Sequence, residues 1–399
     1  MDTLITLIRW PEYLVLAYLG GSALYFLIFA IASHLYRERT RGQRLRPSRV
    51  AILLPSYQED AVILETARAA GEHISAHHEV ETLVLADSLQ PATVAQLKTG
   101  PARVLEVSFE NSTKAKSIRK GLEVVDPGVD YILVLDADNV MAPGCVDALV
   151  EQLQSGFRVV QGQRTAKNDN TDFAVLDGLS EATNNAIFRT GHRVLGLSAA
   201  LIGSGFACEA PLFRELMDRA EAVGGFDKEL ELFLLEQGIT IGYARKAVIL
   251  DEKIQKADAF VNQRRRWLSA QFIYFGRNIG RGLRLLLTRG RIDYFDKLIQ
   301  FILPPRILTL GATGLMAVVY LLLSIWWPFG LVALWWTGAF LATAIAIAIS
   351  LPARTYSLKT LKSLAQLPLG FWLTLKALFK LKGANKKFIH TEHGIDEHS

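Results

Sequence analysis

The sequence has 399 residues with a formal net charge of +5, and 50% of its residues are hydrophobic while 21% are charged. Its mean hydropathy is +0.22, a positive value that soluble domains of this size rarely reach, so the composition predicts a membrane protein and excludes wholesale disorder. The two cysteines, Cys145 and Cys208, exclude a disulfide framework and favour reduced thiols in a cytosolic compartment.

Two long uncharged runs predict membrane-spanning helices. Residues 13–36 contain no Asp, Glu, Lys or Arg, and neither do residues 307–353, where Trp327-Pro328-Phe329-Gly330 interrupts the run. A helix rises about 1.5 Å per residue, so about 20 apolar residues cross the roughly 30 Å hydrocarbon layer. We therefore expect one span near the N-terminus and two more that are joined by a tight turn with aromatic residues at the interface.

The charges beside the first run predict its orientation. The residues before it hold Arg9 against Asp2 and Glu12, whereas arginines dominate the residues that follow it. These are Arg37, Arg39, Arg41, Arg44, Arg46 and Arg49. The positive-inside rule then places everything after Tyr36 in the cytoplasm. A nucleic-acid surface is disfavoured, because the arginines lack interleaved aromatic residues and adjoin a span.

Two further segments have the character of interfacial helices. Residues 293–306 lead into the second span, and residues 354–399 mix apolar residues with lysines. Because Lys376 and Lys380 would lie in hydrocarbon if this last segment crossed the membrane, we expect it to lie on anionic lipid instead. The predicted parts of the chain are a first span with its basic flank (1–49), a soluble domain (50–291), an interfacial helix with two spans (292–353) and a basic tail (354–399).

The soluble domain is predicted to contain a mainly parallel β-sheet. Five short runs rich in Val, Ile and Leu alternate with stretches of helical period, and this alternation is typical of an α/β fold with helices flanking the sheet. The runs are residues 50–54, 82–85, 103–107, 131–135 and 158–160. In such sheets ligands bind beyond the carboxyl ends of the strands, so the polar residues that follow each run are candidate site residues.

Polar residues follow four of these runs. They are Ser56, Tyr57 and Glu59 after the first, Asp87 after the second, Lys114 after the third, and Asp136 and Asp138 after the fourth. Two aspartates one residue apart at a strand end suit a hard divalent ion, which prefers oxygen ligands and commonly bridges diphosphate oxygens. A solvated turn is the alternative, but a buried strand has no structural use for two acids at its end.

Two later motifs contain candidate catalytic residues. Asp227 begins a helical stretch that ends near Gly238, where it is either a general base or an acid favoured by the helix dipole. Further on, Gln263, Arg266 and Trp267 share one helical face by their i, i+3, i+4 spacing. A guanidinium suits phosphate oxygens and an indole suits stacking on a sugar or a base. A basic run beside the membrane would explain the arginines but not this spacing.

Taken in order, these motifs resemble those of family-2 membrane glycosyltransferases, in the group that contains cellulose, chitin and hyaluronan synthases. The resemblance covers residues 50–306 and, in outline, the flanking spans. It is carried by residues 55–59, Asp87, Lys114, Asp136-Ala137-Asp138, Asp227 and Gln263-Arg264-Arg265-Arg266-Trp267. It implies a GT-A type α/β fold with added transmembrane and interfacial helices.

The resemblance also implies a role for each residue. Asp227 is the expected catalytic base, and Asp138, helped by Asp136, is the expected ligand of Mg²⁺ or Mn²⁺. Asp87 would hold the uridine of the donor, and Lys114 its diphosphate. The expected donor contacts are Ser56, Tyr57, Glu59, Asp87, Lys114, Asp136 and Arg266, and the expected acceptor contacts are Gln263, Trp267, Gly203, Ser204 and Gly205.

The motif around the expected base departs from the family pattern. Gly225-Phe226-Asp227 stands where the family has Thr-Glu-Asp, so a second acid is missing. Whether Glu229 or Glu231 assists Asp227 stays open. Cys208 is expected to be a small buried residue, because the family forms no covalent intermediate.

The implied enzyme is a metal-dependent hexosyl- or N-acetylhexosaminyltransferase that uses a UDP-sugar and inverts the anomeric carbon. We expect the acceptor to be a growing β-linked polysaccharide or oligosaccharide. The alternative is a membrane lipid, such as a polyprenyl phosphate or ceramide, that receives one sugar, and few spans suit such an enzyme. A catalytically silent nucleotide-sugar-binding subunit is a third hypothesis, which the intact acids disfavour.

The resemblance and the spans together predict a location and partners. We expect a multi-pass protein of the inner or plasma membrane with a cytoplasmic catalytic domain. Its partners would be the lipid bilayer, a UDP-sugar and a glycan or lipid-linked acceptor, and no nucleic acid. Three spans are few for a polysaccharide channel, so export of a polymer would require a homo-oligomer or an export partner.

Overall fold

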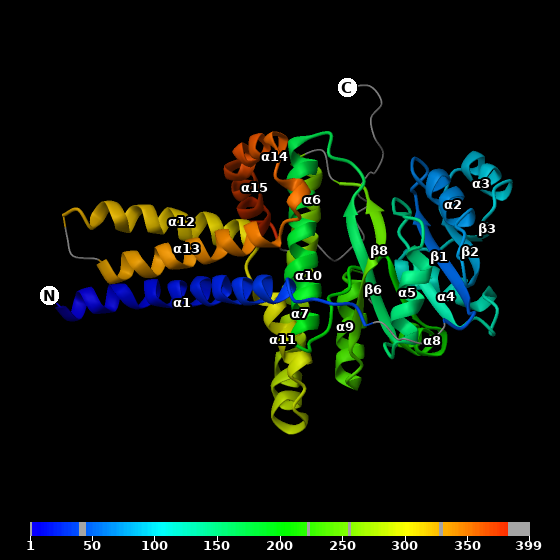
Figure 1. The fold of residues 1–399 in the computed structure, drawn as a ribbon, viewed down its shortest axis with the longest axis horizontal. Coiled ribbons are helices and arrows are strands. Elements are labelled where there is room, and N and C mark those ends of the chain that lie inside the picture. The colour runs from blue at the N-terminus through cyan, green and yellow to red at the C-terminus, as the bar shows by residue number, and fades with distance from the viewer. Residues whose placement is uncertain (1, 40–44, 222–223, 254–256, 327–329, 382–399) are drawn as a thin grey trace.

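The chain folds into an α/β domain and a set of long helices that project from one side of it (Figure 1). A computed structural model describes residues 2–39, 45–221, 224–253, 257–326 and 330–381. Arg41 and Arg44, the aromatic turn at 327–329 and the tail beyond residue 381 lie outside the described residues.

Within those residues, eight strands form one sheet in the order β3-β2-β1-β4-β7-β6-β8-β5. The strands are β1 (Arg49–Tyr57), β2 (Glu79–Asp87), β3 (Arg103–Val107), β4 (Tyr131–Val134), β5 (Val140–Met141), β6 (Val159–Ala166), β7 (Phe206–Glu209) and β8 (Ile241–Asp251). Strands β1 to β4 are parallel neighbours, and so are β6 and β8. Strand β7 runs antiparallel to both β4 and β6. The predicted α/β fold with a mainly parallel sheet is confirmed.

The central strands read as unbroken apolar runs because both faces of the sheet are covered. Along β1, Ile52 packs into the core that faces α2 and α5, whereas Leu53 packs into the core that faces α4 and α8. Successive side chains of a strand point to opposite faces, so a strand buried on both sides has no polar positions. The helices of these layers are α2 (Ile63–Gly71), α3 (Pro91–Lys98), α4 (Lys114–Val124), α5 (Cys145–Gln154) and α8 (Ala210–Arg219).

A second set of helices lies between the sheet and the long apolar helices (Figure 1). They are α6 (Asp172–Asn184), the π-helix η1 (Asn185–Gly191), α7 (His192–Val194), α9 (Phe226–Gln237), α10 (Ala257–Arg289) and α11 (Ile292–Ile302). Helix α11 covers the predicted interfacial segment, and it packs on α9 and α10 through Tyr294, Leu298 and Phe301. This segment is therefore buried along much of its length within the protein.

Among the described residues, three helices are long and apolar enough to cross a membrane: Trp10–Ser33, Arg306–Leu323 and Leu331–Ser350. They belong to α1 (Asp2–Ser33), α12 (Arg306–Leu323) and α13 (Gly330–Ser350), which lie side by side (Figure 1). Trp336 is fully buried among them and donates its indole N–H to Glu12 Oε1 at 3.1 Å. The apolar segments predicted from the sequence thus form one bundle.

The described part of the C-terminal tail folds back onto this junction. It consists of η2 (Ala353–Thr355), α14 (Leu358–Ser363), η3 (Leu364–Gln366) and α15 (Leu367–Phe379). Helix α15 packs on α10 and α12, and α14 packs on α6. The tail therefore covers the seam between the α/β domain and the bundle, and its contact with lipid stays a prediction.

Helix α1 approaches η1 closely at Gly191, and a substitution at this position tests the contact. A Cβ atom at position 191 would lie 2.2 Å from the carbonyl oxygen of Phe29, a backbone atom that cannot turn aside. We expect Gly191→Ala to lower the free energy of unfolding by about 1–3 kcal/mol, the usual effect of overpacking, as measured by thermal unfolding in detergent. Gly20→Ala is the matched control, because a Cβ there meets nothing within 4 Å. An unchanged unfolding temperature for Gly191→Ala would contradict this packing.

Candidate active site

The first part of the site lies where β1 and β2 end side by side. Tyr57 pairs with Asp87 in the parallel register, and the next residue of each strand, Gln58 and Ser88, has a positive φ of 57° and 56°. These are the only non-glycine residues with positive φ in the described ranges, and such strain is commonly kept at functional sites. Beyond this turn, the Glu59 carbonyl accepts hydrogen bonds from the chain that leads into α2.

Asp87 is completely buried at this strand end. Its Oδ1 accepts a hydrogen bond from Ser88 Oγ at 3.0 Å, and its Oδ2 accepts one from Ser117 Oγ at 3.4 Å. Ser56 Oγ is buried as well, and it has no hydrogen-bond partner among the residues that the structure describes. The strand ends thus hold a buried carboxylate that accepts hydrogen bonds from hydroxyl groups, together with a buried hydroxyl that lacks a partner. Both are features of a site that binds a polar ligand.

Lys114 connects the end of β4 with the start of α9 and with a glycine-rich loop, Gly203-Ser204-Gly205. Its Nζ pairs with Asp136 Oδ1 and donates to the carbonyl oxygen of Gly203 at 2.7 Å. Gly203 has a φ of 79°, and a Cβ atom there would lie 3.8 Å from Asp227 Cβ and 4.0 Å from Lys114 Nζ. The structure therefore brings together Lys114, Asp136, Gly203 and Asp227, which are far apart in the sequence.

The loop that holds Gly203 also fixes the second aspartate of the pair. Ser204 Oγ accepts a hydrogen bond from Asp136 N at 2.9 Å and donates one to Asn139 Oδ1 at 2.5 Å. Asn139 Nδ2 in turn donates to Asp138 Oδ1 and to Asp251 Oδ1, each at 3.0 Å. Burial, Asp251 and Asp136 raise the pKa of Asp138 well above its usual value. Three carboxylates thus crowd this strand end.

The donor set at this strand end fits a hard divalent cation. Among the described residues, no group of three or more His, Cys, Asp and Glu side chains has metal-binding geometry. Asp136 and Asp138 would supply protein ligands, and two carboxylates are usual for a cation that takes its remaining oxygens from a diphosphate and water. The crowding that raises the pKa of Asp138 is what a divalent cation would relieve, and Lys114 already neutralises Asp136.

Asp227 also lines a cavity of about 530 Å³. Arg266 and Trp267 of α10 line the same cavity, and Ile202 does so just before the glycine-rich loop. Burial lowers the pKa of Arg266. The far side of the cavity consists of apolar residues from the long helices, among them Phe26, Ile307, Leu310, Ile347, Leu351 and Leu367. The cavity therefore runs from the end of the sheet to the apolar bundle.

The other predicted site residues lie at different distances from this cavity. Asp87, Asp136 and Asp138 do not line it, and they adjoin it through the contacts of Lys114 and Gly203. Gln263 is one turn before Arg266 on α10 but is not part of the lining, and its Oε1 is buried without a partner among the described residues. The predicted face of Gln263, Arg266 and Trp267 is therefore divided.

The two acids considered beside Asp227 have different surroundings. Glu231 is buried, accepts a hydrogen bond from Leu201 N at 2.7 Å and pairs with Lys297 Nζ at 2.8 Å. Glu229 Oε2 accepts a hydrogen bond from Glu221 N at 3.1 Å. Asp227 pairs with the adjacent Lys228 at 3.2 Å. Asp227 and Glu231 both line the cavity, whereas Glu229 does not, and only Glu231 of these two is engaged by Leu201 and Lys297.

The glycine-rich segment is partly a strand. Gly205 N donates to Val134 O at 2.7 Å, and from Phe206 the chain continues as β7 between β4 and β6. Gly205 has a φ of 64°, so the backbone favours glycine, and a Cβ atom there would also displace Ile249 Cδ1, which would lie 2.5 Å away. Cys208 lies in β7 and is buried, as expected.

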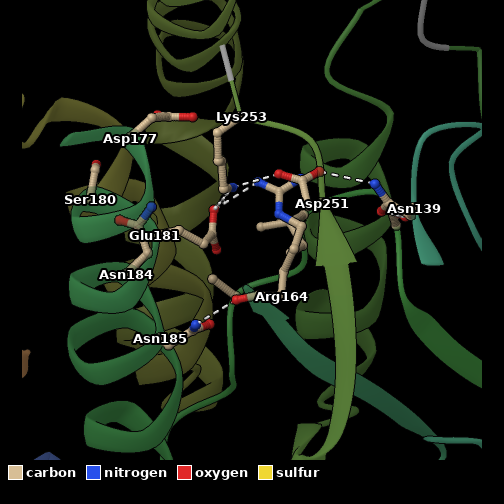
Figure 2. A network of polar contacts seen from close by, with 12 residues as sticks. Asn139, Arg164, Asp177, Ser180, Glu181, Asn184, Asn185, Asp251 and Lys253 are labelled. Atoms are coloured by element: carbon tan, nitrogen blue, oxygen red, sulfur yellow. Dashed lines mark hydrogen bonds and ion pairs between the residues drawn. The ribbon is translucent and has the colours of Figure 1, made fainter. Parts of the chain in front are cut away.

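Sequence reasoning missed a buried network of charges behind the strand ends (Figure 2). Glu181 pairs with Arg164 at 2.8 Å and with Arg189 at 2.9 Å, and Asp251 pairs with Arg164 at 3.4 Å. Lys253 bridges the two acids. The network reaches Asp138 through Asn139, so it connects α6 and η1 to the candidate metal site. Asp251 follows an apolar run, the signal that could have revealed it.

Removal of one charge from this network is expected to destabilise the fold. Although burial raises it, the pKa of Glu181 is held well below its usual value by Arg164, Arg189 and Lys253, so the ion pairs stabilise the fold at neutral pH and lose effect as the pH falls. We expect Glu181→Gln to lower the free energy of unfolding by about 3–5 kcal/mol in chemical unfolding experiments. Asp169→Asn, which breaks the exposed Lys359–Asp169 pair, is the control and should change it by less than about 1 kcal/mol. Equal stabilities of the two variants would contradict a structural role for the network.

Among solved structures, the mannosyltransferase PcManGT from Pyrobaculum calidifontis, in complex with GDP-Man and Mn²⁺, is similar over 84% of this chain and 97% of its own, with 14% identity and a TM-score of 0.50. Glucosyl-3-phosphoglycerate synthase from Mycobacterium tuberculosis, in complex with Mn²⁺, UDP and phosphoglyceric acid, is similar over 53% of this chain and 73% of its own, with 18% identity and a TM-score of 0.39. At 14% identity, the first likeness shows the fold.

No curated protein sequence matches the chain. The family model described as "Glycosyltransferase like family 2" matches residues 47–270, which is more than half of the chain. The matched segment contains the strand ends, the glycine-rich loop, Asp227 and the arginine-rich start of α10. The chain therefore belongs to glycosyltransferase family 2.

Proposed function

We propose that this family-2 glycosyltransferase moves a sugar from a UDP-sugar to an acceptor at the membrane, in one inverting displacement with Asp227 as the general base. The observation that supports this most directly is the position of Asp227. It lies beside Gly203 and Lys114 on one side, and it lines the cavity that reaches the apolar helices on the other. A base at that point would stand between a donor at the strand ends and an acceptor in the cavity.

The donor would lie along the ends of β1, β2 and β4. Asp87 would accept hydrogen bonds from the uracil or ribose, and the orphaned hydroxyl of Ser56 would gain a partner there. Tyr57 and Glu59 would complete the nucleotide pocket. Mg²⁺ or Mn²⁺, when held by Asp136 and Asp138, would neutralise charge on the diphosphate.

Two cations of the chain would stabilise the leaving group. Lys114 would exchange its contact with Asp136 for the diphosphate, and Arg266 would approach the same oxygens from α10. Fixed positive groups aimed at charge that develops in the transition state give the largest effects in such sites. Trp267 would stack on the sugar, and Asp227 would take the proton of the acceptor hydroxyl as it attacks the anomeric carbon.

The acceptor that the cavity favours is a membrane lipid. Its apolar wall is formed by residues from all three candidate spans and from α15, which suits an acyl or isoprenoid chain better than a hydrophilic glycan. The growing β-linked polysaccharide expected from the motifs is the second candidate, favoured by the arginine and tryptophan of α10. Three spans leave little room for a polymer channel within one chain.

The same arrangement supports a multi-pass protein with a cytoplasmic catalytic domain. The three apolar helices form one bundle, and Arg39 and Arg46 of the basic flank contact α5 through Gln152 and Gln154. We therefore propose residues 50–291 as the catalytic domain, residues 1–49 and 292–353 as its membrane part, and residues 354–399 as a basic tail at the lipid surface.

One experiment tests the proposed function. The full chain is purified in nanodiscs made from bacterial lipid and incubated with radiolabelled UDP-sugars and GDP-sugars in the presence of Mg²⁺ or Mn²⁺. The expected result is a single labelled sugar in the lipid fraction and no label when EDTA is added. A long labelled polymer would support the second candidate. No transfer from any donor to lipid, glycan or water would contradict the proposal.

A further inference from the structure

We propose that the acceptor lipid carries a phosphate group and that Arg306, at the start of α12, binds it. This inference rests on the proposed lipid glycosyltransferase and names the headgroup of its acceptor. The P–OH group of the singly protonated phosphate would attack the anomeric carbon, Asp227 would take its proton, and the bond to the nucleoside diphosphate would break. What is new is the assignment to Arg306, which lies outside the motifs that carry the resemblance and outside the residues that the family model matches. Its evidence is the charge, the partners and the position of this one side chain.

Arg306 lines the cavity and donates hydrogen bonds to neutral groups of α6. Its Nη1 donates to Asn184 Oδ1 at 2.8 Å, and its Nη2 donates to the carbonyl and hydroxyl oxygens of Ser180 at 3.1 and 3.2 Å. Among the described residues, no carboxylate lies within ion-pair distance of this guanidinium. These three bonds leave about two of its five N–H groups for another acceptor. The α6 contacts therefore fix its position without neutralising its charge.

Other basic residues of the lining have acidic partners. Arg264 pairs with Asp177 at 3.0 Å, Lys297 with Glu231 at 2.8 Å, and Lys228 with Asp227 at 3.2 Å. Arg164 and Arg189 share Glu181. Arg266 is assigned to the donor diphosphate by the proposed function. Among the cations of this lining, Arg306 is therefore the one that neither pairs with a described acid nor is assigned to the donor. Its charge is available to bind the acceptor.

The position of Arg306 matches the depth of a lipid headgroup. It is the first residue of a helix that is long and apolar enough to cross a membrane, and the next residues of that helix, Ile307 and Leu310, continue the cavity wall. A lipid whose phosphate contacts Arg306 would therefore have its chain beside apolar side chains of α12, α13 and α15. Basic pockets between membrane helices on the cytoplasmic side are typical sites for anionic headgroups.

Helix α12 itself favours an anion at this point. The positive end of its dipole lies at its N-terminus, where Arg306 adds a charge of the same sign and the first turn holds no acid. A neutral headgroup would leave both charges uncompensated beside apolar surface, which is costly, whereas a phosphate would compensate them with charge-assisted hydrogen bonds. These features favour a lipid phosphate over a neutral sphingolipid or alcohol.

The binding test compares two lipids that differ only in the phosphate. The full chain is purified in a maltoside detergent, which contains no phosphate, and binding of a radiolabelled C55 polyprenyl phosphate and of the C55 alcohol is measured. We expect the phosphate to bind about tenfold more tightly or better, the effect of at least one charge-assisted hydrogen bond. Inorganic phosphate at millimolar concentration should not displace the lipid. Full displacement would mean that the site binds phosphate alone and would overturn the lipid assignment.

Variants then assign the preference to Arg306. Arg306→Gln should lose most of the preference for the phosphate, and Arg306→Lys should keep part of it. The control is Arg354→Gln, which should leave the preference unchanged, because Arg354 is exposed beyond α13 and does not line the cavity. Thermal unfolding of each variant checks that the α6–α12 contact survives. If Arg306→Gln does not fold, the Lys variant and the wild-type preference decide. An undiminished preference in folded Arg306→Gln would overturn the role of Arg306.

Transfer assays separate this inference from the proposed function. Equal transfer of sugar to phosphorylated and neutral lipids would overturn the phosphate inference while the lipid glycosyltransferase stands. Transfer to no acceptor, with any donor, would overturn the proposed function whatever the lipids bind. Transfer that is confined to phosphorylated lipid and is reduced about tenfold or more in Arg306→Gln would support both.

Discussion

Replacement of Asp227 by asparagine is expected to lower the rate of sugar transfer by about 10²–10⁴-fold, the usual contribution of a general base. The carboxylate lies at the junction of the Lys114–Gly203 contact and the cavity, and asparagine keeps its shape but accepts no proton. Because the donor contacts are at the strand ends, the affinity for UDP should change little. Initial rates in nanodiscs at saturating donor, with UDP affinity measured by calorimetry, check both expectations.

The matched control for this variant is Glu229→Gln on the same helix. Glu229 is absent from the cavity lining, and a glutamine can still accept the hydrogen bond from Glu221 N. We expect its transfer rate to stay within about threefold of the wild type, because a side chain that does not contact the reacting groups contributes little to stabilising the transition state. If Asp227→Asn still transfers sugar at a similar rate, or if Glu229→Gln is the variant that loses activity, the assignment of the base is wrong.

The strands of the sheet were predictable because burial on both faces leaves a plain signal. The predicted runs 103–107 and 131–135 correspond to β3 and β4 almost residue for residue. Polar residues at such strand ends stand out against the apolar runs before them, which is why Asp87, Asp136 and Asp138 could be named from the sequence. The three long apolar helices were predictable for a similar reason, since a long run without charge has few other uses.

The rest of the sheet and site depends on contacts between distant segments. Strand β7 could not be predicted, because its start coincides with the glycine-rich turn and its antiparallel pairing depends on β4 and β6. The division of Gln263 from Arg266 depends on what packs around α10, and helical spacing alone does not contain that information. Arg306 belongs to no motif. The role proposed for it depends on how the other cations of the lining are paired among the described residues.

Asp138→Asn is expected to lower transfer by about 10²–10³-fold and to abolish the stabilisation of the protein by Mn²⁺. Burial and the carboxylates of Asp251 and Asp136 raise the pKa of Asp138, so its charge destabilises the metal-free fold at neutral pH. Stability from this group is present at low pH and decreases as the pH rises through the raised pKa. In EDTA at pH 7, the asparagine variant should therefore unfold at the same temperature as the wild type or higher.

This combination of lower activity with equal or higher stability is the signature of a carboxylate that is kept for a ligand, because a purely structural acid would lose stability when neutralised. The Asn139 hydrogen bond survives the change, since asparagine Oδ1 still accepts it.

Asp130→Asn, at the other end of β4, is the control. The Asp130 carboxylate accepts a hydrogen bond from Arg49 N at 2.8 Å, and its replacement should leave both the transfer rate and the Mn²⁺ effect unchanged. Unfolding temperatures measured with EDTA and with Mn²⁺ decide the matter. A wild-type protein that Mn²⁺ does not stabilise, or an Asp138→Asn variant that Mn²⁺ stabilises equally, would remove Asp138 from the metal site.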